Sequence, residues 1–140
     1  MIRSTLRLAI AAAFALPALT QEPGPRRVPP TYTTPTSGEA IYAAYCASCH
    51  GATGHGDGPV VPSLKTPPPD LTTLAQRHQG TFPHAAVSEA ITGESLRRSH
   101  GTSDMPVWGP IFRSLDGRSV GATRIRVRTL IEYLKTLQVK

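Results

Sequence analysis

The segment CASCHGATGHGDGP, residues 46–59, decides how the fold of this chain is interpreted. It contains both cysteines of the chain, Cys46 and Cys49, three positions apart, and His50 follows the second directly. Several kinds of site use a C-x-x-C pair, and they predict different proteins. The residue after the pair and the elements around it have to discriminate between them.

Three familiar C-x-x-C sites fit this segment poorly. A structural zinc site needs four ligands, whereas the chain has one cysteine pair, and the adjacent Cys49 and His50 are badly placed to share one metal. A thioredoxin-like redox pair begins a helix that follows a strand, but this pair comes at the end of a predicted helix. A disulfide between Cys46 and Cys49 would close too short a loop to restrict the unfolded chain much.

The C-x-x-C-H arrangement is the attachment site of c-type haem. Two thiols about one helical turn apart can form thioether bonds to the two vinyl groups of a single porphyrin. The histidine that follows is then held beneath the iron and can ligate it. The sequence therefore predicts one covalently attached haem per chain, with Cys46 and Cys49 as its anchors and His50 as the proximal iron ligand.

Met105 is the candidate for the second axial ligand. It is the only methionine that remains once the first residues are removed, and it lies with Pro106 in the predicted loop SDMPVWG, residues 103–109. A thioether ligand favours ferrous iron and raises the reduction potential. The rival sixth ligands are the other histidines: His55, His78, His84 and His100. His55 lies too close to His50 along the chain to reach the opposite face of a porphyrin.

Residues 1–20 predict a secretory signal peptide. A positive start with Arg3 and Arg7 is followed by an apolar run that is too short to cross a bilayer as a helix. Cleavage is expected after Ala18 or Thr20. An uncleaved membrane tether is the alternative.

Residues 21–36 are rich in proline and lack apolar periodicity, which predicts an extended linker. The folded domain is expected from Ser37, a residue type that caps helix N-termini, to residue 140. The expected compartment is the periplasm.

Loss of residues 1–20 lowers the formal net charge from +6 to +4, because it removes two arginines and no acid. This positive excess is too small to indicate nucleic-acid binding.

Apolar spacing and helix end signals predict an all-α domain. One short helix is expected to begin after Ser37 and to carry the cysteine pair at its end, and brief helices are expected over 70–80 and 83–92. An apolar stripe marks the last helix: Val127, Leu130, Ile131, Leu134 and Leu137. In the same helix Arg124, Arg126 and Arg128 form either a solvated face, which we favour, or a docking patch for an acidic redox partner. No alternating strand pattern or internal repeat is found.

With these features the chain resembles class I c-type cytochromes, a family of small monohaem all-α proteins, over about residues 37–138. It is similar in particular to the bacterial branch that includes the cytochrome c subunits of cbb3-type oxidases. The matching residues are Gly38, Tyr42, the CASCH segment 46–50, Gly58, Pro59, Met105, Pro106, Leu130 and Tyr133. The resemblance implies a cytochrome c fold of three to five short helices wrapped around one haem. Its first and last helices would cross at Gly38, Tyr42, Leu130 and Tyr133.

Two further residues receive expected roles at the haem. The resemblance implies that the carbonyl of Pro59 accepts a hydrogen bond from the His50 ring and orients it. Trp108, three residues after Met105, either donates its indole N–H to a haem propionate or packs in the core.

The expected function is the transfer of single electrons between redox proteins in the periplasm. With both axial positions of the iron filled, no small-molecule substrate is expected, and the chain is expected to be a monomer. Two alternatives stay open. The chain would be a cytochrome c subunit of a larger membrane oxidase or dehydrogenase, or a haem enzyme or gas sensor from which Met105 is displaced.

Intact mass spectrometry checks the attachment. For the chain exported by a host that attaches haem, we expect loss of residues 1–18 or 1–20 and a gain of one haem mass that survives denaturation, because thioether bonds are covalent. A Cys46→Ala, Cys49→Ala variant should lose that added mass. A bare polypeptide from the unaltered chain would contradict the whole interpretation.

Overall fold

The structure, a computed structural model, describes residues 30–93 and 105–139. In these two ranges it is helical and contains no strand. The α-helices are α1 (Gly38–Tyr45), α2 (Ala47–His50), α3 (Leu74–Arg77), α4 (His84–Thr92), α5 (Trp108–Leu115) and α6 (Val120–Thr136). A 3-10 turn, η1, spans Val61–Ser63. The all-α prediction is confirmed.

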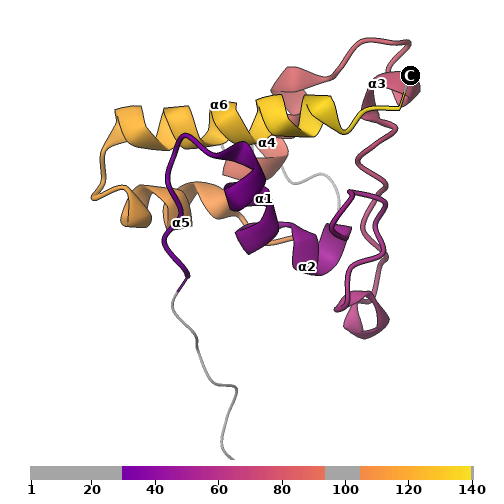
Figure 1. Ribbon diagram of the computed structural model, residues 1–140, viewed down its shortest axis with the longest axis horizontal. Coiled ribbons are helices and arrows are strands. Elements are labelled where there is room, and N and C mark those ends of the chain that lie inside the picture. Colours follow the sequence, from indigo (N-terminus) through magenta and orange to yellow (C-terminus); the bar gives the residue numbers. More distant parts are fainter. Residues whose placement is uncertain (1–29, 94–104, 140) are drawn as a thin grey trace, which may run out of the picture.

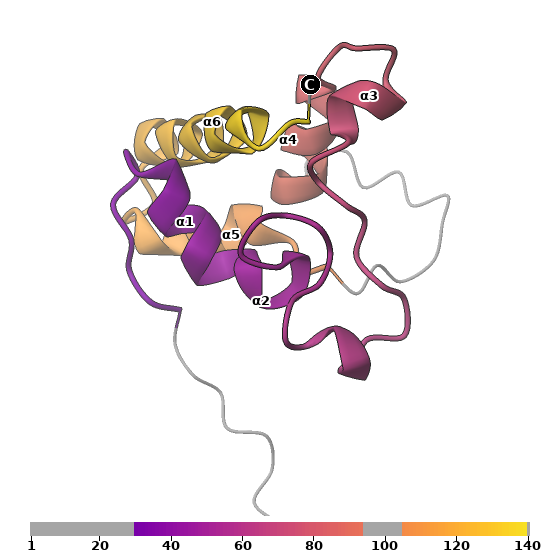
Figure 2. The same ribbon diagram turned by 45° about the vertical axis from the view of Figure 1, so that its right-hand side comes forward.

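Helix α6 organises the domain. It runs along one edge, and α1, α4 and α5 all pack against it. Figure 1 shows α1 crossing α6, with α5 running back beneath α6 from a short turn. The long segment between α2 and α4, which contains η1 and α3, forms the other side of the domain (Figure 2).

The predicted helix ends are largely confirmed. Ser37 caps α1, since its Oγ accepts the Ala40 N–H at 3.2 Å. Helix α4 ends at Gly93, which adopts the left-handed conformation (φ +69°) typical of glycine at this position. The helix expected over 70–80 is reduced to the single turn α3. The reason is that Asp70 accepts the Thr72 N–H at 2.7 Å, which begins an Asx-type turn instead of a helix.

The described residues contain six α-helices, more than the three to five expected. Two of them, α2 and α3, are single turns. Helix α5 was not predicted, because its sequence WGPIFRSL is short and holds a glycine at its second position. Tertiary packing stabilises it, since Phe112 is fully buried in the core.

The crossing of α1 and α6 is confirmed at the residues that the resemblance implied. Tyr42 and Leu130 are buried, and the Tyr42 and Tyr133 ring centroids lie 5.4 Å apart. Gly38 permits the close approach. A Cβ at Gly38 would lie 2.4 Å from the Thr129 carbonyl oxygen and 2.7 Å from the Tyr133 Cβ.

Residues 31–33, here called the N-terminal strap, belong to the folded domain. The Tyr45 hydroxyl donates to the Thr31 carbonyl oxygen, and Arg126 Nη1 donates to Thr33 Oγ1 at 2.6 Å. The boundary expected at Ser37 is therefore too late, because these contacts come from residues distant in sequence. The predicted signal peptide and the first part of the predicted linker lie outside the described residues.

The arginines of α6 divide into two groups. Arg124 and Arg128 are exposed, but Arg126 is completely buried. The expectation that all three share a solvated or docking face is therefore wrong for Arg126. Among the described helices, none is long and apolar enough to cross a membrane.

Gly38→Ala is expected to lower the free energy of unfolding by about 1–3 kcal/mol, because the new methyl group overpacks the α1–α6 crossing. Denaturant unfolding of the haem-loaded protein measures this. Gly121→Ala is the matched control in α6, where the nearest atom to the new Cβ is Ser119 Oγ at 4.0 Å. It should leave stability unchanged or raise it by about 0.4–1 kcal/mol. Equal effects of the two substitutions would contradict the close crossing.

Candidate cofactor site

The C-x-x-C-H segment forms a single helical turn directly after α1. The N–H groups of Cys49 and His50 both bond to the Cys46 carbonyl oxygen, at 3.1 and 2.9 Å. Residues three and four positions apart share one face of a helix. As a result, Cys46, Cys49 and His50 all line one cavity. Both cysteines are free thiols.

The two thiols lie in different environments. Cys46 is buried and Cys49 is partly exposed. Burial, and secondarily the neighbouring Cys49, raises the pKa of Cys46 to about 12. A raised pKa favours the thiol over the thiolate, which is the form that reacts with oxidants and alkylating agents.

His50 is oriented for metal ligation by a backbone carbonyl. Its Nδ1 atom lies 3.3 Å from the Pro69 carbonyl oxygen. A carbonyl can only accept, so Nδ1 carries the proton and Nε2 keeps its lone pair. Burial lowers the pKa of His50, and the Pro69 contact only partly opposes this. Neutral imidazole, the form that binds a metal, is thereby favoured.

The carbonyl that contacts His50 was expected from Pro59, and the structure corrects this to Pro69. The chain after His50 turns back along α2, where Gly58 N–H bonds to the Cys49 carbonyl oxygen at 3.1 Å. This return leaves Pro59 exposed, away from the ring. Ten residues later the chain crosses the ring at the TPPP segment, residues 66–69.

Glycines in the loop 51–58 permit close packing behind α2. A Cβ at Gly58 would lie 2.3 Å from the Ser48 carbonyl oxygen, and one at Gly56 would lie 2.6 Å from the Pro68 carbonyl oxygen. None of the residues of this loop lines the cavity.

The cavity has a volume of about 650 Å³, which lies within the usual range for cofactor sites. Its walls are mostly apolar and come from α1, α2, the 64–74 segment, α4, the residues around Met105, and α6. The side chains that matter most here are Tyr45, Cys46, Cys49, His50, Pro69, His78, Val87, Ile91, Met105, Trp108, Leu130 and Leu134. Two thiols, a neutral imidazole and a thioether on the walls of one apolar chamber fit a c-type haem.

Met105 reaches the same cavity as His50 from a different part of the chain. It is half-buried against the core and comes three residues before α5. The start of α5 is held against α4, because a Cβ at Gly109 would lie 2.4 Å from the Thr92 carbonyl oxygen. Met105 therefore lies on the cavity wall, and its role as the second axial ligand stays a prediction.

Trp108 also lines the cavity. Its ring packs on Tyr45, with centroids 5.3 Å apart, and stacks on Phe112 at 6.0 Å. This supports the core-packing alternative for Trp108. The propionate contact stays a prediction.

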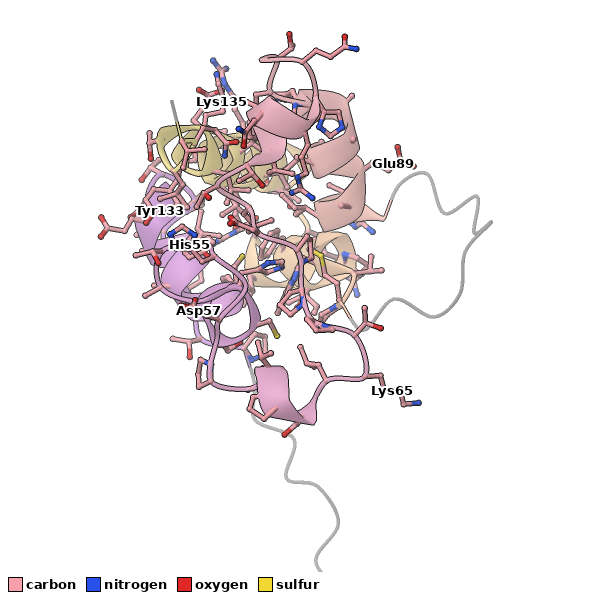
Figure 3. The ribbon with its side chains drawn as sticks, turned by 90° about the vertical axis from the view of Figure 1, so that its right-hand side faces the viewer. His55, Asp57, Lys65, Glu89, Tyr133 and Lys135 are labelled. Atoms are coloured by element: carbon pink, nitrogen blue, oxygen red, sulfur yellow. The ribbon has the colours of Figure 1, made fainter. Side chains whose placement is uncertain are left out.

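The rival histidines are not equivalent. His78 lines the cavity, although its Nδ1 lies 2.8 Å from the Leu74 carbonyl oxygen. His55 is exposed, and its Nδ1 lies 3.4 Å from Asp70 Oδ2. Figure 3 shows His55 near Asp57 on the loop, and it shows the Lys65 side chain extending away from the domain. His84 is exposed outside the cavity lining. His100 lies outside the described residues.

No group of three or more His, Cys, Asp or Glu side chains within residues 30–93 and 105–139 is placed to hold a metal ion by itself. Sequence reasoning missed Tyr45 and Pro69 as site residues. The tyrosine was assigned only to the apolar face of a helix, and the contact of Pro69 with His50 spans 19 positions. The one sequence signal was the run of three prolines at 67–69, because proline restricts the backbone conformation of the segment.

Pro69→Gly should free the segment that crosses His50. We expect the His50 Nδ1 proton to exchange with solvent about tenfold faster in the reduced haem-loaded protein, the factor for about 1.4 kcal/mol of lost protection. Pro59→Gly is the matched control and should leave that exchange rate unchanged. NMR of the ring N–H resonance measures both. A larger effect of Pro59→Gly would restore the original assignment.

A comparison with known protein families gives a match. Residues 33–116 match the family model described as cytochrome C oxidase, cbb3-type, subunit III. The match includes the strap residue Thr33, the C-x-x-C-H segment and Met105, and ends before α6. No similar curated protein and no similar solved structure was found.

Proposed function

The chain belongs to the cbb3-type cytochrome c oxidase subunit III family, and we propose that it carries single electrons through one haem c whose iron is ligated by His50 and Met105. One observation carries this proposal above all. The chamber of about 650 Å³ brings the C-x-x-C-H turn and Met105, which are more than fifty residues apart in sequence, to the walls of one site.

Each residue at the site has a distinct task. Cys46 and Cys49 would hold a haem through two thioether bonds, each thiol supplying the sulfur and the proton that add across one vinyl group. His50 would offer Nε2 to the iron, while the Pro69 carbonyl orients the ring. A bound haem supplies the ferric–ferrous couple.

The apolar wall supports electron transfer over catalysis. Leu130, Leu134 and Ile91 line the cavity and are nearly fully buried, so water is kept from that side. Ligation by both His50 and Met105 leaves no position for a substrate, and a thioether ligand raises the potential. Ala44, Ser48 and Pro67 line the cavity and are also exposed, so the site opens to the surface there.

A partner protein would approach the haem at this opening. Such contacts between electron carriers are small and short-lived. We propose that the donors and acceptors are periplasmic or membrane-bound redox proteins, in keeping with the signal peptide expected over residues 1–20. The family match favours a second candidate, in which the chain is a subunit of an oxidase complex. Purification as a stable complex with membrane proteins would support the subunit role, and purification as a free monomer would support the carrier.

Met105→Ala tests the distal ligand. The ferric wild type should show the sulfur-to-iron charge-transfer band, and the variant should lose it. The reduction potential should fall, because the soft ligand that favours ferrous iron is removed, and the ferrous variant should bind carbon monoxide. Visible spectroscopy and a redox titration measure these changes.

His78→Ala is the matched control, because His78 is the rival histidine that lines the cavity. It should leave the band and the potential unchanged. Loss of the normal spectrum in His78→Ala with retention in Met105→Ala would assign the iron to His78. Carbon monoxide binding to the unaltered ferrous protein would instead favour a haem enzyme or gas sensor.

A further inference from the structure

We propose that Arg126 and the N-terminal strap are positioning elements for the distal ligand. They hold the aromatic wall of the cavity, and through it the segment that carries Met105. The inference rests on the proposed His50 and Met105 ligation.

Arg126 uses its whole guanidinium group in buried contacts. Its Nη2 and Nε donate to the two carboxylate oxygens of Asp116 at 2.6 and 3.2 Å, and its Nη1 donates to Thr33 Oγ1 at 2.6 Å. Both side chains of the ion pair are essentially inaccessible to solvent. A buried ion pair is weak evidence for added stability, because desolvation offsets the attraction. The specific effect of the Arg126 contacts here is geometric, because one planar guanidinium group on α6 is bonded both to the end of α5 and to the strap.

The same guanidinium group lies between two aromatic rings. Its carbon is 5.5 Å from the Phe112 ring centroid and 5.7 Å from that of Tyr32 in the strap. Phe112 in turn packs on Tyr45, with centroids 5.3 Å apart. The strap also holds Tyr45 directly, because the Thr31 carbonyl oxygen accepts the Tyr45 hydroxyl proton. The strap therefore contacts Tyr45 directly, and Arg126 reaches Tyr45 through the Phe112 ring.

This cluster reaches the haem site through Tyr45 and Trp108. The two rings pack on each other, with centroids 5.3 Å apart, and both line the cavity. Trp108 is the first residue of α5, and Met105 lies three positions before it. A shift of Tyr45 or Phe112 would therefore move the start of α5. Met105 sits on the short connection that would move with it.

The consequence is a link between the strap and the closure of the sixth coordination position. While the strap is bound, the start of α5 is held and Met105 stays at the cavity. When the contact of Arg126 with Thr33 is lost, the closed arrangement is less favoured, and an added ligand competes with Met105 more easily.

Thr33→Val is the first test in the haem-loaded protein, because it removes only the acceptor oxygen and keeps the shape of the side chain. We expect the affinity of the ferric protein for imidazole to rise about tenfold, the factor expected when one hydrogen bond from a charged group no longer favours the closed state. The sulfur-to-iron band should weaken in parallel. Thr33→Ser keeps the hydroxyl and should behave like the wild type.

Thr34→Val is the matched control. Thr34 is the next residue, it is exposed, and its side chain makes none of the strap contacts.

The double variant Arg126→Leu, Asp116→Leu separates positioning from stability. Replacing both charges with apolar groups leaves no buried charge unpaired, and the partly exposed Thr33 hydroxyl that loses its donor can bond to water, so stability should be largely kept. The imidazole affinity should nevertheless rise as in Thr33→Val.

The outcomes are distinguishable. Imidazole affinity that is the same in Thr33→Val, the double variant and the wild type would overturn the positioning role, whatever their melting temperatures. An equal rise in Thr34→Val would also overturn it. Absence of the sulfur-to-iron band from the wild type would instead overturn the Met105 ligation, and the inference with it.

Discussion

A chamber of about 650 Å³ inside so small a domain is the constraint on which the rest of the structure depends. Protein interiors are normally packed without voids of this size. The apolar side chains that line the chamber, such as Leu130, Leu134 and Ile91, offer a wall against which a large flat apolar cofactor can pack. The domain and the haem that the family implies would thus form one core between them.

A domain built around such a chamber needs its rigidity at the periphery. Here it comes from close backbone contacts and from one buried polar cluster. Gly38 lets α1 cross α6, and Gly109 lets α5 meet α4. Arg126 on α6 bonds to Asp116 at the end of α5 and to Thr33 in the strap. These directional contacts fix the relative positions of the three segments more narrowly than aliphatic packing would. These contacts fix the positions of the helices that line the cavity. The helices in turn fix the positions of the candidate ligands His50 and Met105.

The chemistry of the site follows from the same packing. Burial lowers the pKa of His50 and so favours its neutral form, and the contact with the Pro69 carbonyl leaves the Nε2 lone pair available to a metal. Burial also raises the pKa of the Cys46 thiol. Neither effect could be derived from the C-x-x-C-H letters, because both depend on which distant segments cover the turn.

The sequence by itself determined the parts that are local. The spacing of Cys46, Cys49 and His50 sets one helical turn and so one kind of cofactor, and the apolar stripe of the last helix sets its buried face. Met105, which the sequence singled out as the candidate second ligand, lines the cavity. Helix ends such as Ser37 and Gly93 were also readable, because capping depends on neighbours along the chain.

Only the tertiary structure decided the contacts between distant segments. It placed Pro69 rather than Pro59 on the His50 ring and formed the short helix α5 despite its glycine. It also buried Arg126 on a helix where Arg124 and Arg128 are exposed. Each of these outcomes depends on a partner 10 to 93 positions away in the chain. Local propensity contains no information about such partners, because the free energy of a contact between distant segments is gained only when the chain brings the segments together.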